Sequence, residues 1–285
     1  MLFLMLSIAI TAGIGFYFYR NKQNNSRLQQ QFNQVIGLRQ LIHLLRFHRR
    51  KTHWVLSHPH TENHDKALNE SLAIQSLIKT LLSQADMAHK PMYRILMKRI
   101  TVLLNEWPHY SLRRNQVCHG KTIRHVMYLI DDTITQSLLC AEKDPQFKHY
   151  QKIWPIVLNA IDSLSRFRYS IENYRPERVS NHQRELALHA NIINRRMKQI
   201  AHLNHRTISH LQLDELRAEF DVIPLQDNNL TNNKERLYQY SLKLSDTIYL
   251  LFDMVLVDIA EELSVHLPPI PNKSVQNTVI KLNTN

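Results

Sequence analysis

The chain has 285 residues, with 36 Lys and Arg against 24 Asp and Glu, a formal net charge of +12 and 44% hydrophobic residues. This hydrophobic fraction excludes a chain that is disordered throughout. Only four glycines occur in the whole sequence. Such a low number excludes the glycine-rich phosphate loops and nucleophile elbows of many nucleotide-binding and hydrolytic folds.

Residues 1–19 carry no charged side chain, and they end in the aromatic run Phe16–Tyr19 before Arg20. At about 1.5 Å per residue, a helix of this length just spans a hydrocarbon layer of about 30 Å. Aromatic residues followed by cations are typical of a membrane interface, whereas a cleavable signal peptide carries its cations before the apolar run. The sequence therefore predicts a single-pass transmembrane anchor over 1–19 and a basic juxtamembrane linker over 20–25. Because the cations follow the anchor, we expect the domain on the cytoplasmic side of the plasma membrane.

The next stretch, residues 38–56, combines an apolar helix face with many basic side chains. Positions three and four residues apart form one stripe, which contains Leu38, Leu41, Ile42, Leu45, Arg49 and Thr52. The apolar stripe thus continues into a guanidinium group. Two interpretations stay open: Arg49 extends out of a bundle toward water or acidic lipid, or it contacts an anion inside the protein.

The rest of the chain has helical periodicity, interrupted by loops rich in Pro, Asn and Asp. The sequence predicts an all-α fold with eight helices after the anchor, at about 28–56, 66–88, 91–106, 118–142, 147–174, 182–203, 210–221 and 232–264. Residues 266–285 contain three prolines and no long helical pattern, which predicts a flexible tail.

Similar segments in the two halves indicate an internal duplication. At a shift of 120 positions Arg46-Phe47 aligns with Arg166-Phe167, and at a shift of 114 Asp132–Ile134 is identical to Asp246–Ile248. These matches follow in chain order with nearly constant offsets. They predict two tandem antiparallel four-helix units, one over 26–145 and one over 146–265.

No metal or catalytic motif is visible in the sequence. The two cysteines, Cys118 and Cys140, give neither a disulfide framework nor a zinc quartet, and the seventeen histidines show no His-Glu-x-x-His pattern. Nor is there a recognisable set of nucleophile, base and orienting residue. We therefore expect no metal, no cofactor and no enzymatic activity.

The chain resembles the nitrate- and nitrite-sensing (NIT) domain, an all-helical bacterial sensor module of two four-helix bundles. The first helix of that family carries a pattern of leucine-valine-x-alanine-leucine-glutamine-x-glutamate-arginine-glycine. The positions that match its frame are Leu41, Ile42, Leu45, Arg49, Thr52 and Leu56. Arg46, His48 and Arg50 stand in place of the family's glutamine, glutamate and glycine. The late helix from Leu237 resembles the tyrosine-bearing closing helix of such domains.

The resemblance implies a site for a small oxyanion, nitrate or nitrite, between arginines from facing helices of the two bundles. Arg49 matches the family's arginine by position, and Arg50 lies beside it. The family's second glutamate-arginine pattern is missing, because Tyr169 and Ser170 occupy the corresponding positions. Three arginines of the second unit are candidates for the opposing role: Arg166, Arg168 and Arg175. A guanidinium suits a planar oxyanion because it offers a rigid fork of donors and keeps its charge.

The distribution of charge leaves a second function open. Residues 26–145 contain 17 Lys and Arg against 9 Asp and Glu, whereas residues 146–265 contain 15 against 15. This excess near the predicted anchor also fits attraction to acidic membrane lipid. Nucleic acid is not an expected partner, because no recognition helix or nucleic-acid motif gathers the basic residues. The two hypotheses are a membrane-anchored sensor for signal transduction that binds an oxyanion, and a ligand-free helical scaffold for an unknown protein partner.

Overall fold

The structure is a computed structural model, and it describes residues 2–58, 68–174, 179–204, 209–223 and 230–268. Within these ranges the chain folds into eight α-helices and a short 3-10 turn, which confirms the predicted all-α class. The helices are α1 Leu2–Ser57, α2 Leu68–Gln84, α3 Lys90–Glu106, α4 Leu112–Cys140, α5 Asp144–Glu172, α6 Val179–Leu203, α7 His210–Asp221 and α8 Leu230–Glu262, with η2 Trp107–His109 between α3 and α4.

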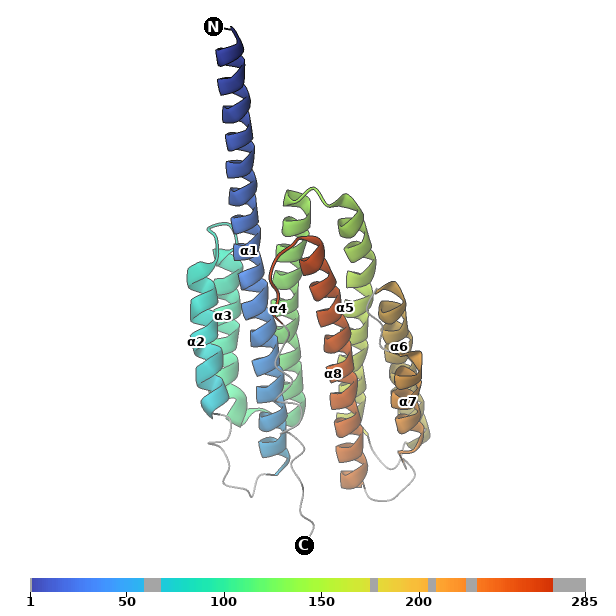
Figure 1. Ribbon diagram of the computed structural model, residues 1–285. Helices are drawn as coiled ribbons and strands as arrows, with labels where there is room; N and C mark the ends of the chain where they lie inside the picture. The colour runs from blue at the N-terminus through green and yellow to red at the C-terminus, as the bar shows by residue number, and fades with distance from the viewer. Residues whose placement is uncertain (1, 59–67, 175–178, 205–208, 224–229, 269–285) are drawn as a thin grey trace.

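Two helices begin more than three residues from the predicted position. The α4 helix starts six residues earlier than expected, because the Ser111 side chain accepts a hydrogen bond from the Arg114 backbone N–H at 3.2 Å and caps the helix. The α1 helix is continuous from Leu2 to Ser57, so that residues 20–25, expected as a linker, form part of it. As a result, the N-terminal part of α1 extends beyond the rest of the bundle (Figure 1).

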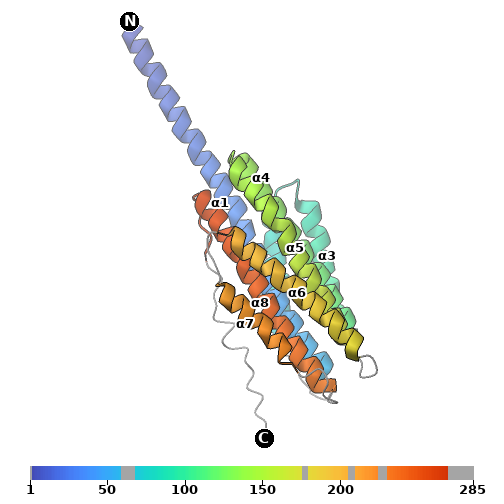
Figure 2. The ribbon, with the colours of Figure 1, turned by 90° about the vertical axis from the view of Figure 1, so that its right-hand side faces the viewer.

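Four long helices, α1, α4, α5 and α8, form the centre of the molecule (Figure 1). The α2 and α3 helices lie on one side of this centre, against α1 and α4. On the opposite side α6 and α7 cover α5 and α8 (Figure 2). The α4 and α5 helices follow each other in the chain and pack together, and they connect the first four helices to the last four.

The helices pack in the same main pattern within the first group, α1 to α4, and within the second group, α5 to α8. The first helix of each group packs on the second and the fourth, the second packs on the third, and the third packs on the fourth. One hydrophobic core nevertheless runs through both groups and includes residues of all eight helices. The internal duplication that the sequence suggests stays a prediction.

The apolar stripe on α1 packs into this core as its periodicity predicts. Leu38, Leu41 and Leu45 are fully buried, and the stripe continues into the buried Arg49. The predicted anchor over 1–19 lies almost entirely outside the residues whose side chains are described. In the part of the chain that the structure describes, no helix has the length and apolar character needed to cross a membrane. Most of the predicted tail over 266–285, from residue 269 onward, is also outside the described ranges.

Candidate functional site

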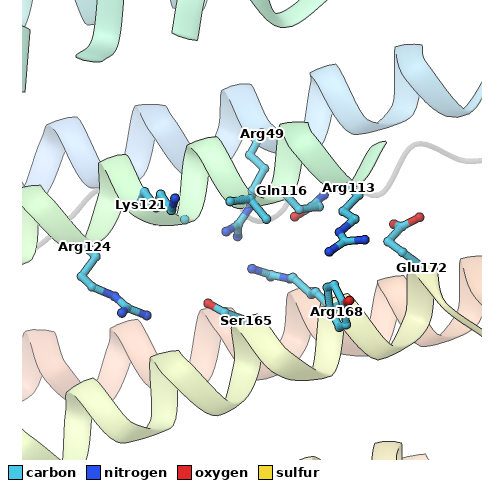
Figure 3. Close-up of a pocket in the computed structure, with 11 residues that line it drawn as sticks. Arg49, Arg113, Gln116, Lys121, Arg124, Ser165, Arg168 and Glu172 are labelled. Atoms are coloured by element: carbon cyan, nitrogen blue, oxygen red, sulfur yellow. The ribbon is translucent and has the colours of Figure 1, made fainter. Parts of the chain in front are cut away.

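A pocket of about 220 Å³ opens between α1, α4 and α5, where the two groups of helices meet. Five cationic side chains and one carboxylate line it: Arg49, Arg113, Lys121, Arg124, Arg168 and Glu172. Figure 3 shows the guanidinium groups of Arg49 and Arg168 pointing into the same space from opposite sides. The pocket therefore contains one arginine from each of the two predicted units.

Polar contacts between α1 and α4 hold the part of α1 that carries Arg49. One turn beyond it, the Thr52 hydroxyl accepts a hydrogen bond from Asn115 Nδ2 at 3.0 Å, and both residues are fully buried. On the next residue of α1, the ring of His53 lies 3.0 Å from Gln116 Nε2 and stacks on Tyr238 with ring centroids 3.6 Å apart. These contacts surround Arg49 with ordered side chains from α4 and α8.

Arg168 is held from the other side by α8. Its Nε donates to Ser241 Oγ and its Nη2 to the Ser241 backbone oxygen, both at 3.1 Å. Ser241 Oγ in turn donates to the backbone oxygen of Tyr238 at 2.7 Å. Both acceptors of Arg168 are neutral, so its positive charge has no counter-ion among these partners.

The two guanidinium groups are buried, and neither forms an ion pair within the described ranges. Arg49 and Arg168 are each 5% exposed, and Nε and Nη2 of Arg49 have no hydrogen-bond partner within the described part of the chain. Burial lowers the pKa of Arg49, and the positive charge of Arg50 acts in the same direction, while the carboxylate of Asp246 opposes the shift without reversing it. Burial and the positive charge of Arg49 hold the pKa of Arg168 well below its ordinary value. Burying a charge without compensation costs several kcal/mol, so this arrangement favours an anion between the two groups.

The structure places the other two predicted site residues outside the pocket. Arg50 turns toward α8, where it and Arg46 both donate to Asp246. Arg166 lies on the exposed surface of α5 and does not line the pocket. The reason is geometric, because successive residues of an α-helix are rotated by about 100°. Neighbours of Arg49 and Arg168 therefore point elsewhere. Arg175, the third candidate for the opposing role, lies outside the described residues.

The contribution of α4 was missed by the sequence interpretation. Arg113, Gln116, Gly120, Lys121 and Arg124 line the pocket from this helix. Their spacing puts them on one helix face, which is the only signal that the sequence carries for them. A face with basic residues is also typical of a helix surface in water, so the spacing alone does not indicate a site.

Among the described residues, no group of three or more His, Cys, Asp or Glu could hold a metal ion. The densest histidine group of the sequence includes His60 and His64, which lie outside the described ranges. Cys118 and Cys140 are both free thiols.

Comparisons with known proteins give no match: no protein-family model fits the chain, and neither a curated protein nor a solved structure is similar to it. The resemblance to the NIT domain thus stays a prediction.

Proposed function

We propose that this protein is a helical sensor that binds a small oxyanion, such as nitrate or nitrite, between Arg49 and Arg168. The observation that carries the proposal is that two buried guanidinium groups point into one pocket, while Nε and Nη2 of Arg49 have no hydrogen-bond partner among the residues that the structure describes. A protein does not bury two like charges side by side without a large unfavourable free energy. An anion between them would supply the missing acceptors and the missing negative charge.

The chemistry of the guanidinium favours a planar oxyanion. Each guanidinium offers a rigid, planar fork of N–H donors that matches the oxygens of nitrate, nitrite or a carboxylate. Arg168 is positioned by Ser241, so its fork is ordered before a ligand arrives. Chloride lacks this geometry and is the natural reference ion.

Binding at this place would connect the two groups of helices. Arg49 belongs to α1 and Arg168 to α5, so that one ligand would link the first group to the second. A ligand that binds one arrangement of the helices better than another shifts the population toward it. We propose that this shift is the signal, read by a protein partner or transmitted through α1, whose first 19 residues we still interpret as a membrane anchor. The bulk of the protein would then lie in the cytoplasm.

The alternative function, a ligand-free scaffold for protein partners at the membrane, allows Arg49 to face water or lipid. The burial of Arg49 supports the sensor instead, because a scaffold has no need of a buried unpaired cation.

The test is a thermal unfolding experiment on the full-length protein, titrated with nitrate, nitrite or chloride at constant ionic strength. A ligand that binds only the folded state stabilises it by RT ln(1 + [L]/Kd), about 2.7 kcal/mol at a hundred times Kd. We expect nitrate or nitrite, and not chloride, to raise the melting temperature. Equal curves in all three salts would contradict the proposal.

Two pairs of variants assign the effect to the pocket. Arg168→Gln is expected to lose the nitrate response, whereas Arg166→Gln removes the same charge from the exposed side of α5 and is expected to keep it. In the same way, Arg49→Gln should lose the response and Arg50→Gln should keep it, since Arg50 contacts Asp246 outside the pocket. A response that survives in Arg49→Gln and Arg168→Gln would place the anion elsewhere.

A further inference from the structure

The pocket is larger than nitrate requires. Its volume is about 220 Å³, whereas a water molecule occupies roughly 30 Å³ in the liquid and nitrate has only four heavy atoms. It is also elongated, because its lining residues on α4 extend from Arg113 to Arg124, about 16 Å at 1.5 Å per residue. Space therefore remains beside an oxyanion held by Arg49 and Arg168.

The charged residues differ between the two ends of this elongated pocket. Arg113 and Glu172 lie on one side of the central arginines, and Lys121 and Arg124 lie on the other (Figure 3). The first end thus carries one cation and one carboxylate. At the second end two cations line the pocket without a lining carboxylate, and only Arg124 has an ion-pair partner outside it, Asp162.

The surface between the centre and this second end is open. Gly120 lies there on α4, and a Cβ atom built on it would meet no atom closer than Ser165 Oγ at 4.0 Å. Val117 lies one turn before Lys121 and adds apolar surface to the lining. A short carbon chain could therefore lie along α4 between the central arginines and the Lys121 end.

We infer that the preferred ligand is a short organic dicarboxylate, with one carboxylate between Arg49 and Arg168 and the other near Lys121 and Arg124. The inference rests on the proposed function, since it uses the same central arginines. A carboxylate accepts two parallel hydrogen bonds from a guanidinium as well as nitrate does. The second carboxylate contacts Lys121 and Arg124, which a nitrate between the central arginines does not reach. The dicarboxylate therefore binds more tightly than nitrate.

The test compares succinate, acetate and nitrate as ligands of the full-length protein, by calorimetry at constant ionic strength. We expect succinate to bind about tenfold more tightly than acetate, the ratio that corresponds to about 1.4 kcal/mol. In the double variant Lys121→Gln/Arg124→Gln, succinate should bind no better than acetate. Arg114→Gln is the matched control, because this exposed arginine of α4 pairs with Glu106 and does not line the pocket.

A second variant tests whether succinate needs the open space beside Gly120, and it leaves the charges of Lys121 and Arg124 in place. Gly120→Leu places a larger side chain on the open surface, and leucine is favoured over glycine within a helix. We expect this variant to lose the preference for succinate while it remains folded. A preference for succinate that persists in both variants, or that is absent from the wild type, would overturn the inference. If nitrate binds and succinate has no advantage, the proposed function stands without the inference; if no anion binds, both fail.

Discussion

Arg49 of α1 and Arg168 of α5 extend into one pocket although they belong to different groups of helices, and each is 5% exposed. Neither has a carboxylate partner among the described residues. Without a ligand, each of these buried charges therefore lowers the stability of the folded protein. Removal of one of them should stabilise the fold, which is unusual for substitution of a buried residue.

Arg49→Met is expected to stabilise the ligand-free protein. Replacement of buried charge by an apolar side chain of similar volume is often neutral or stabilising, by about 1–4 kcal/mol. Urea unfolding in a buffer of low anion concentration measures the effect, and the same variant should lose any stabilisation by nitrate. If Arg49→Met is less stable than wild type without ligand, Arg49 has a favourable structural role and the argument for an anion weakens.

Arg39 provides the control for this experiment. It is also 5% exposed and lies on the same helix, but it forms an ion pair with Asp253 of α8. Arg39→Met should destabilise the protein by about 2–4 kcal/mol, because it leaves a largely buried carboxylate without its partner. Opposite signs for two equally buried arginines would identify the missing counter-ion as the cause.

The sequence predicts the helices well because their signal is local. Hydrophobic periodicity and loop residues depend on a few neighbouring positions, and all eight expected helices are present in the described ranges. The capped start of α4 at Ser111 was missed, since the preceding Trp107–Tyr110 segment resembles a loop in sequence.

The site is less predictable because it depends on how helices are rotated against each other. The stripe on α1 predicts that Arg49 faces inward. On α5 a similar stripe, Val157, Ile161, Leu164, Arg168 and Ile171, carries the same signal for Arg168, and the sequence interpretation missed it. The internal alignment does not help, because it pairs Arg166 with Arg46 and puts Tyr169 opposite Arg49. The structure places Arg166 on the exposed surface. Lys121 and Arg124 are close to Arg168 only because α4 packs beside α5, and a single sequence does not contain this information.

Asp246→Asn is expected to weaken the connection between α1 and α8. Asp246 accepts hydrogen bonds from both Arg46 and Arg50, and Arg46 also lies 4.2 Å from the ring of Tyr249. Loss of the carboxylate leaves two largely buried cations near each other, and we expect about 1–3 kcal/mol of lost stability, measured as a lower urea midpoint at an unchanged slope.

The control for Asp246 is an exposed ion pair. Asp221 is paired with Arg217 within α7, and its side chain is 66% exposed. Asp221→Asn should change the stability by less than about 0.5 kcal/mol, as is typical of surface pairs. Equal effects of the two substitutions would mean that Asp246 does not hold the helices together.

Buried histidines should make the protein sensitive to acid. His48 Nδ1 lies 2.9 Å from His119 Nε2, and burial lowers the pKa of His48 from 6.5 to about 4. Burial, with the charge of Arg168 next, lowers the pKa of His53 to about 3. The unfolded chain therefore binds more protons than the folded one between about pH 6.5 and pH 4, so that stability decreases as the pH falls through this range.

The measurement is urea unfolding at pH 7, 5.5 and 4.5. Each such histidine contributes a slope of at most about 1.4 kcal/mol per pH unit, and His48→Gln should reduce the total slope by roughly that amount. His109→Gln, at an exposed position, serves as the control. A slope that is the same in wild type and His48→Gln would show that this histidine is not the acid-sensitive group.

Two helical glycines should respond in different ways to the same substitution. Alanine is favoured over glycine inside a helix by about 0.8–1.0 kcal/mol. At Gly120 the added Cβ meets only Ser165 Oγ at 4.0 Å, so Gly120→Ala should gain most of this stabilisation. At Gly37 the Cβ would come within 2.7 Å of Leu81 Cδ2, and Leu81 is 1% exposed in the core between α1 and α2. Displacement of this leucine costs about 1–3 kcal/mol when extra volume enters a packed core.

Gly37→Ala should therefore be less stable than Gly120→Ala by at least about 1 kcal/mol, measured by urea unfolding under identical conditions. The double variant Gly37→Ala/Leu81→Ala separates the gain in helix propensity from the cost of displacing Leu81. It removes the side chain that the new Cβ meets, so the loss caused by Gly37→Ala should be smaller in this background than in the wild type. If Gly37→Ala stabilises the protein as much as Gly120→Ala does, Leu81 moves without cost and α1 and α2 are less tightly packed than the contact implies.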